Sequence, residues 1–197
     1  MPPNQPTPLD GLLALALGYA EFAMRSIGHV PPALLADSPS GFIQFVPASL
    51  KEERAEHNFA NAARLTCIGY EVTAAVLVLE AWIKVAGPGE RLDLTEPPSE
   101  AFDRREVVVL TGETAKQSVQ RLLPIIRTDA GGFFGLGEHE GPHLDKFEGW
   151  FAHLIPPKRP NAENREMARA LLAAMGRPRL PSVASFAGSI RLALCCA

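Results

Sequence analysis

The residues best suited to bind a metal ion lie in one short segment of the second half of the chain. His139, His143 and Asp145 bring imidazole and carboxylate groups close together, and divalent transition metals take both kinds of ligand. His139 and His143 are four positions apart, but Gly141 and Pro142 between them break the helix that would align them. The segment is therefore expected to be a solvated acidic loop, with a metal site as the alternative. No cofactor is expected.

Glu80 is the residue with the clearest potential for acid–base chemistry. It lies in an apolar run and shares a face with Val78 and Trp82 if that run is a strand. Burial raises the pKa of a carboxyl group, as a general acid requires. Arg104 or Arg105, at the start of the next expected strand, would instead hold Glu80 ionised in a structural pair. We expect the structural pair, and catalysis by Glu80 is the alternative.

Signatures of the common enzyme classes are missing. The sequence has no Gly-x-Ser-x-Gly, no Gly-x-Gly-x-x-Gly and no phosphate loop that ends in Lys-Ser or Lys-Thr. Its three cysteines, Cys67, Cys195 and Cys196, form no Cys-x-x-Cys pair, which disfavours a disulfide framework and a zinc site of usual spacing. Cys67 falls in an apolar helical pattern and is interpreted as a small core residue.

Charge is unevenly distributed along the chain. Residues 156–197 carry seven basic and two acidic side chains, whereas residues 1–155 carry 12 and 20. Such a basic segment lies on the acidic body or docks to a protein partner, or it binds the phosphates of nucleic acid. The segment lacks interleaved aromatic residues that stack on bases, which favours the first interpretation. The candidate nucleic-acid contacts of the alternative are Lys158, Arg159, Arg165, Arg169, Arg177 and Arg179.

These groups depend on the helices and strands that position them, and the first such element is a helix over residues 9–27. Its apolar residues recur at spacings of three and four, Asp10 suits its first turn, and Gly28 suits its end. The apolar face is broad and almost uncharged, so it must be buried. We expect a core helix, and a dimerisation helix is the alternative.

Two further helices are expected. Ser49 and Glu52 have the spacing of a capping box at the start of a helix over residues 49–69. Asn161 suits the cap of a helix over residues 162–175, with Gly176 as its stop.

The expected strands lie mainly between these two helices. The run 72–85 is apolar on both alternating faces and predicts a central strand that is covered on both sides. Short turns join the strands after it, and short turns force antiparallel pairing. Pro124 has no N–H to donate, which indicates a sheet edge or a bulge. The other expected strands are 41–46, 106–111, 117–127 and 133–136.

Three short motifs carry a resemblance to known proteins. They are Glu80-Ala81-Trp82, Pro98-Ser99-Glu100 and Asp103-Arg104-Arg105-Glu106-Val107-Val108-Val109. In these motifs the region 49–136 resembles a loose group of small uncharacterised proteins of bacteria and their phages. The resemblance implies a unit of helix and small sheet and an origin in a mobile element. It implies no activity and no site residue.

Composition and the ends of the chain complete the prediction. The chain has 197 residues, of which 47% are apolar, and a net charge of −3, so it can bury a core and has no general attraction for anionic surfaces. Its proline-rich start has no Lys or Arg, and the apolar stretch 12–24 is shorter than the roughly 20 residues of a membrane span. We therefore expect a cytoplasmic protein without membrane contact.

The expected architecture is α+β, an antiparallel meander of three to five strands flanked by about three helices. The expected organisation is a disordered tail (1–8), one domain (9–155) and a basic helix and tail (156–197). The leading hypothesis for function is a non-enzymatic protein that binds a protein partner or itself. The alternatives are a nucleic-acid-binding accessory protein that uses the basic segment, and an enzyme centred on Glu80 or on the loop of His139 and His143.

Overall fold

The computed structural model describes residues 7–47, 53–84, 97–139 and 151–175. These residues form an α+β fold with one antiparallel sheet, as expected. The helices are α1 (Pro8–Ile27), α2 (Glu53–Gly69) and α3 (Ala162–Ala174). The strands are β1 (Ala33–Ser38), β2 (Gly41–Phe45), β3 (Ala74–Ile83), β4 (Arg105–Thr114), β5 (Ser118–Arg127) and β6 (Phe133–Leu136).

The described strands number six, so the expected count of three to five is too low. They follow the order β2-β1-β3-β4-β5-β6, and every neighbouring pair is antiparallel. The run from β3 to β6 is the expected meander, with β3 inside the sheet. The missed strand is β1, whose sequence Ala-Leu-Leu-Ala-Asp-Ser has no β-branched or aromatic residue. It forms because β2 and β3 pair with it on either side.

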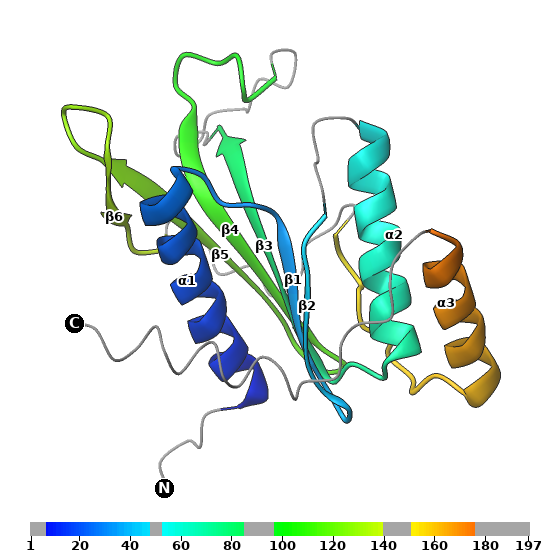
Figure 1. The fold of residues 1–197 in the computed structure, drawn as a ribbon. Helices are drawn as coiled ribbons and strands as arrows, with labels where there is room; N and C mark the ends of the chain where they lie inside the picture. The colour runs from blue at the N-terminus through cyan, green and yellow to red at the C-terminus, as the bar shows by residue number, and fades with distance from the viewer. Residues whose placement is uncertain (1–6, 48–52, 85–96, 140–150, 176–197) are drawn as a thin grey trace, which may run out of the picture.

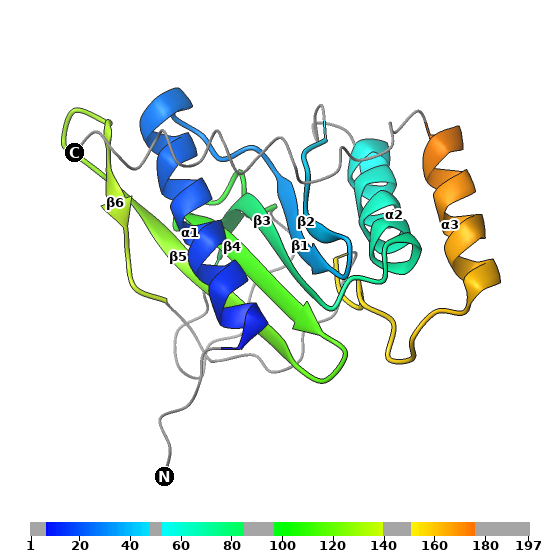
Figure 2. The ribbon, with the colours of Figure 1, turned by 60° about the horizontal axis from the view of Figure 1, so that its bottom comes forward.

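The elements form four layers (Figures 1 and 2). Helix α1 lies on one face of the sheet, α2 lies on the other, and α3 packs on α2 rather than on the sheet. The strand β3 contributes to both interfaces, because alternate residues of a strand point to opposite faces. Val76 and Val78 belong to the core beneath α1, whereas Ala75 and Leu77 belong to the core beneath α2. The expectation of a strand covered on both sides is confirmed.

The ends of α1 are fixed by local chemistry. Thr7 Oγ1 accepts the N–H of Asp10 at 3.3 Å, and Asp10 Oδ2 accepts the N–H of Thr7 at 2.9 Å, which is a capping box. Pro8 occupies the first turn, where its missing N–H costs nothing. At the other end Gly28 takes the left-handed conformation, with φ of 78°. The helix thus begins one residue earlier than expected, and Thr7 and Pro8 belong to it rather than to a tail.

Pro124 lies in β5, and its backbone nitrogen is on the side of the strand that faces away from β4. Pro124 pairs with Val107 of β4, and its carbonyl accepts the N–H of Gly137 at 2.8 Å on the opposite side. The nitrogen and carbonyl of a strand residue point the same way, so the missing N–H also faces away from β4. A register shift between Ile126 and Arg127 follows. Since β5 lies between β4 and β6, it is not an edge strand, and the register shift is the irregularity that the proline indicates.

The start and end of the expected later helices fall partly outside the described residues. The capping box of Ser49 and Glu52 and the stop at Gly176 lie in such segments. Asn161 does cap α3, since its Oδ1 accepts the N–H of Asn164 at 2.8 Å. Within the described residues no helix has the length and apolar character needed to cross a membrane.

Candidate functional site

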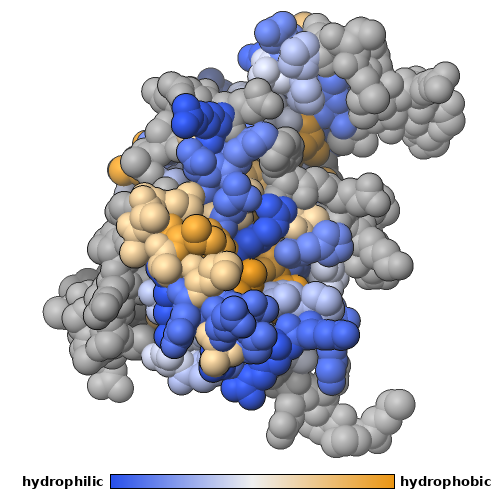
Figure 3. Space-filling model, turned by 90° about the vertical axis from the view of Figure 1, so that its right-hand side faces the viewer, coloured by the Kyte–Doolittle hydropathy of each residue, from blue (hydrophilic) through white to orange (hydrophobic). Residues whose placement is uncertain are grey.

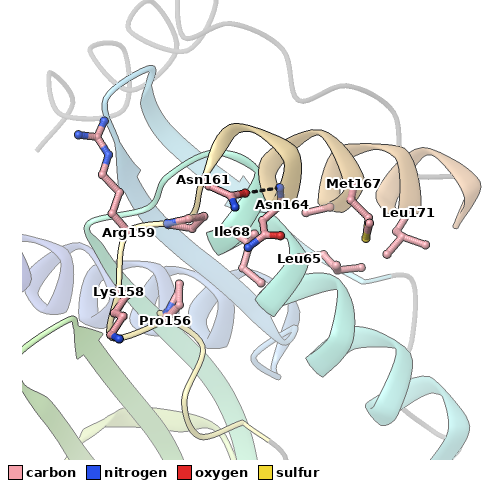
Figure 4. A pocket seen from close by; sticks show the side chains of 11 residues that line it. Leu65, Ile68, Pro156, Lys158, Arg159, Asn161, Asn164, Met167 and Leu171 are labelled. Carbon is pink, nitrogen blue, oxygen red and sulfur yellow. Dashed lines mark hydrogen bonds between the residues drawn. The ribbon is translucent and has the colours of Figure 1, made fainter.

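A groove between α2 and α3 is the candidate functional site (Figure 4). Its volume is about 460 Å³. In Figure 4 Met167 and Leu171 of α3 extend toward Leu65 of α2, and Lys158 lies at the opposite end of the groove. The complete lining is Leu65, Ile68, Pro156, Lys158, Arg159, Pro160, Asn161, Asn164, Met167, Ala168 and Leu171.

Two of the apolar side chains that line the groove, those of Met167 and Leu171, belong to a second apolar stripe on α3. Ala168 and Leu172 are buried against the rest of the protein. Met167 and Leu171 remain 57% and 48% exposed, and Met175 continues their spacing of four residues. Figure 3 shows this side of the molecule, where apolar side chains gather in a patch bordered by hydrophilic ones. Exposed apolar patches bordered by polar residues are typical of interaction sites in other proteins.

The second stripe can be recognised in the sequence, because the apolar residues of α3 do not all fall on one face of the helix. A helix that packs on one neighbour needs about one apolar stripe. In α3 the apolar positions fall into two sets, one at 168 and 172 and the other at 167, 171 and 175. The helix over residues 162–175 was predicted without assigning its apolar residues to faces, so the exposed set was not identified from the sequence.

Glu71 holds α3 and the segment before it against the end of α2. Its Oε1 lies 2.8 Å from Arg159 Nε and 2.6 Å from Arg165 Nη1. These two hydrogen bonds lower the pKa of the Glu71 carboxyl. Glu71 itself has a φ of 54°, in the left-handed region, where the chain turns from α2 toward β3.

Arg169 makes a third connection between the same helices. Its Nε donates to the carbonyl oxygen of Gly69 at 2.7 Å, and its guanidinium lies 5.5 Å from the centre of the Tyr70 ring. A Cβ atom on Gly69 would lie 3.2 Å from Cγ of Arg169. A side chain at position 69 would therefore require the Arg169 side chain to shift by a few tenths of an ångström.

Glu113 holds the chain segment that leads into residues 156–160 of the groove. This carboxylate is 4% exposed, at the end of β4. It accepts the backbone N–H groups of His153, Leu154 and Ile155 at 2.8, 2.7 and 3.3 Å. A buried carboxylate of this kind must be satisfied by donors. Glu113 thereby anchors the segment that leads into Pro156 and the rest of the groove lining.

The basic residues of the sequence prediction thus have different roles in the structure. Arg159, Arg165 and Arg169 contact Glu71, Gly69 and Tyr70 of the same chain. Lys158 is exposed and forms no ion pair with any residue in the described part of the chain. Arg177 and Arg179 lie outside the described residues. The groove consequently has one cationic end.

A second, smaller cavity of about 380 Å³ adjoins this region, with Cys67 and Glu71 among its lining residues. Cys67 is 1% exposed. Burial, and to a smaller extent the charge of Glu113, raises the pKa of the Cys67 thiol to about 12. Such a thiol stays protonated and does not act as a nucleophile, so the interpretation of Cys67 as a core residue is confirmed.

Glu80 does not form the ion pair that the sequence predicts. Its Oε2 accepts the backbone N–H of Val30, just after α1, at 2.7 Å. Arg104 lies over the ring of Trp82 instead, 4.7 Å from its centre. Arg105 falls on the other face of the sheet because strand residues alternate. The expected pairing with Arg104 or Arg105 is therefore wrong, although the role of Glu80 in this geometry is still structural.

His139 also has a structural contact. Its Nδ1 accepts the backbone N–H of Leu122 on the outer side of β5 at 2.9 Å, so the lone pair of this nitrogen is not free to bind a metal ion. His143 and Asp145, the other two predicted ligands, lie outside the described residues. Among the described residues no group of three or more metal-binding side chains comes together.

Comparisons with protein-family models, with curated proteins and with solved structures found no match to this chain. The case for function therefore depends on the geometry of the groove.

Proposed function

We propose that this protein is a non-enzymatic binding module that takes an amphipathic helix of a protein partner, bearing acidic side chains at one end, into the α2–α3 groove. The observation that carries the proposal is the exposed pair Met167 and Leu171 facing Leu65, with the cation of Lys158 at the end of the same groove.

The apolar part of the groove favours a helix as the occupant. Helices bind in grooves by inserting apolar side chains from successive turns. Methionine is unbranched and flexible, so Met167 adapts to side chains of different shape. The α3 helix is held by Glu71 and Arg169, which keeps the groove formed in the absence of the partner and lowers the cost of binding.

The charge at the end of the groove favours an acidic partner over the chain's own tail. Lys158 has no carboxylate partner within the described residues. The N-terminal end of α3, at Asn161, adds partial positive charge nearby. Residues 176–197 contain Arg177, Arg179 and Arg191 and no acidic residue, so this tail would be repelled.

The contacts within the chain disfavour the two alternative functions, a nucleic-acid-binding protein and an enzyme. A phosphate-binding surface needs cations that face solvent and have no other partner. Arg159 and Arg169 are exposed, but like Arg165 they already contact Glu71 or Gly69 of the same chain. An enzyme centred on Glu80 needs a cavity around the carboxylate, and Glu80 instead holds the backbone of Val30.

A pair of synthetic peptides tests the proposal. Both are labelled amphipathic helices of about 18 residues, with leucines at spacings of three and four. One has two glutamates at one end and the other has two lysines there. Fluorescence anisotropy should show that the acidic peptide binds more tightly, roughly two- to fivefold, because Lys158 is exposed. Lys158→Glu should reverse this preference, whereas Lys116→Glu, an exposed lysine on the β4–β5 turn, should leave it unchanged.

The apolar half of the groove is tested separately. Met167→Glu should weaken binding of the acidic peptide at least about tenfold, since it places a charge in the apolar contact. Phe134→Glu is the matched control, because Phe134 is a comparably exposed apolar residue on β6. Equal loss in both variants, or no binding of either peptide to the native protein, would remove the proposal.

The cellular context is also proposed. We infer a cytosolic protein because Cys67 is a buried free thiol and the three cysteines make a poor disulfide framework. The origin in a mobile element, implied by the resemblance to small bacterial and phage proteins, stays a prediction.

A further inference from the structure

The cavity of about 380 Å³ shares residues 156, 159 and 160 with the α2–α3 groove but has otherwise different walls. Parts of the chain that are distant in sequence meet around it, among them the β1–β2 turn at Pro39, the residues before β3 at Thr73 and the β4–β5 turn at Ala115. Its volume lies in the range of about 300–1,000 Å³ in which proteins bind small molecules. The cavity is therefore large enough for a small organic ligand.

The floor of this cavity is apolar and uncharged. Cys67, Val72 and Ile155 line it, are buried, and belong to the core beneath α2. The Cys67 thiol stays protonated at neutral pH because its pKa is about 12. Glu113 is a buried charge close to Cys67, but three backbone N–H groups already bind its carboxylate. The floor thus favours the hydrocarbon part of a ligand over a polar part.

The exposed side of the cavity is positively charged. Arg159 lines the cavity with its exposed side chain, and Figure 4 shows that this side chain extends away from the α2–α3 groove. Glu71 also lines the cavity, and one of its oxygens binds both Arg159 and Arg165. One carboxylate therefore balances only one of the two guanidinium charges, and the cluster has a net positive charge. Such a cluster attracts an anionic group.

Arg159 has hydrogen-bond donors left for such an anion. Its hydrogen bond to Glu71 uses Nε. Its terminal nitrogens, Nη1 and Nη2, make no hydrogen bond to any residue in the described part of the chain. These two nitrogens form one edge of a planar fork that matches the two oxygens of a carboxylate. A single ligand carboxylate needs only this edge, whereas a nucleic-acid surface needs several unengaged cations.

We propose that this cavity binds a small organic monocarboxylate. The apolar body of the ligand packs on Cys67, Val72 and Ile155, and its carboxylate accepts hydrogen bonds from Nη1 and Nη2 of Arg159. Because Arg159 is exposed to solvent, burial of the apolar body supplies most of the affinity, and the arginine selects the charge of the ligand. This inference goes beyond the binding of a partner helix, and its test uses no peptide.

Three ligands of the same chain length test the chemistry: octanoate, octanol and octylamine. Isothermal titration calorimetry should show that octanoate binds roughly fivefold more tightly than octanol and that octylamine binds most weakly. Arg159→Gln should remove the preference for octanoate, while Arg165 should still hold Glu71 in that variant. Arg54→Gln, which replaces an exposed arginine at the start of α2, should keep the preference. Octanoate that does not bind up to about 5 mM, or equal binding of all three ligands, overturns the proposal.

Substitutions around the cavity and the groove test the location of the ligand. Ala115→Trp should weaken octanoate binding at least about fivefold, because the added ring enters the space that the ligand needs. Ala130→Trp, the same substitution on the exposed β5–β6 turn, should bind octanoate like the native protein. Met167→Glu changes the groove and not the cavity, so it should also leave octanoate binding unchanged. Loss of binding in Met167→Glu but not in Ala115→Trp would place the ligand in the groove and contradict the proposal.

Discussion

Glu71 and Arg165 form the contact on which the candidate site depends. Nη1 of Arg165, in α3, lies 2.6 Å from Oε1 of Glu71, just after α2. Arg159 joins the same carboxylate oxygen at 2.8 Å. Since α3 packs on α2 and not on the sheet, this ion pair helps to fix the distance between the two walls of the groove.

Acid should weaken this connection in a defined range of pH. Hydrogen bonds from Arg159 and Arg165 lower the pKa of Glu71 below its ordinary value of 4.5. A carboxyl group with a lowered pKa in the folded state stabilises the fold fully above its ordinary pKa. That contribution is lost as the pH falls through the lowered value.

The measurement compares variants between about pH 5 and pH 3 by thermal unfolding. Glu71→Gln should be less stable than the native protein at pH 5, and the difference should shrink as the pH falls. Glu166→Gln, an exposed carboxylate on α3, should show no such convergence. A constant difference between Glu71→Gln and the native protein over the whole range would show that the ion pair does not contribute.

Loss of the Glu113 carboxylate should destabilise the protein. Glu113→Gln leaves at least one of the three backbone N–H groups facing an amide NH₂ in a buried site. The cost should be roughly 2–3 kcal/mol of unfolding free energy in urea titration. Hydrogen exchange should show lost protection at residues 153–155. Glu100→Gln, at an exposed position, should stay within about 0.5 kcal/mol of the native value.

Cys67 should resist alkylation in the folded protein. Its pKa of about 12 and its burial leave almost no accessible thiolate at neutral pH. In the Cys195→Ser, Cys196→Ser background, iodoacetamide should not modify the native chain, as followed by intact mass. It should modify Cys67 quantitatively in urea. Rapid modification without denaturant would contradict the described packing of α2 on the sheet.

The sheet beneath α1 should not tolerate a side chain at Gly112. A Cβ atom there would lie 3.0 Å from Cδ1 of Leu9 and 3.0 Å from Cγ1 of Val119. Gly112→Ala should therefore cost about 1–3 kcal/mol of unfolding free energy, as overpacked cores do. Gly135→Ala in β6 is the control, because a Cβ atom there meets nothing within 4 Å. Equal stability of the two variants would mean that α1 packs less closely than described.

The elements that could be predicted from the sequence are those whose own residues have a clear helix or strand pattern. The α1 helix has a periodic apolar face and a terminal glycine, β3 is an apolar run, and short turns separate β4, β5 and β6. These signals depend only on neighbouring residues. By contrast β1 has weak strand propensity and is specified by its two neighbours in the sheet, so it could not be predicted locally.

The candidate site was less predictable than the fold because its contacts join distant parts of the chain. The partners of Glu71 lie 88 and 94 positions further along, and Glu113 contacts residues about 40 positions away. The charge imbalance of the sequence did indicate that the basic segment lies on the acidic body, and the ion pairs of Arg159 and Arg165 fit that prediction. The pairing of Glu80 with Arg104 was wrong because Trp82 attracts the guanidinium instead.

The most direct test of the groove as a binding site is a methyl NMR titration. The chain has four methionines. Met167 lines the groove, whereas Met24 of α1 is buried in the core between that helix and the sheet and serves as an internal control. With ¹³C-methyl-labelled methionine, addition of the acidic amphipathic peptide should shift the Met167 signal progressively and leave the Met24 signal in place. A Met167 signal that does not move at saturating peptide, or equal shifts of Met167 and Met24, would contradict binding in the groove.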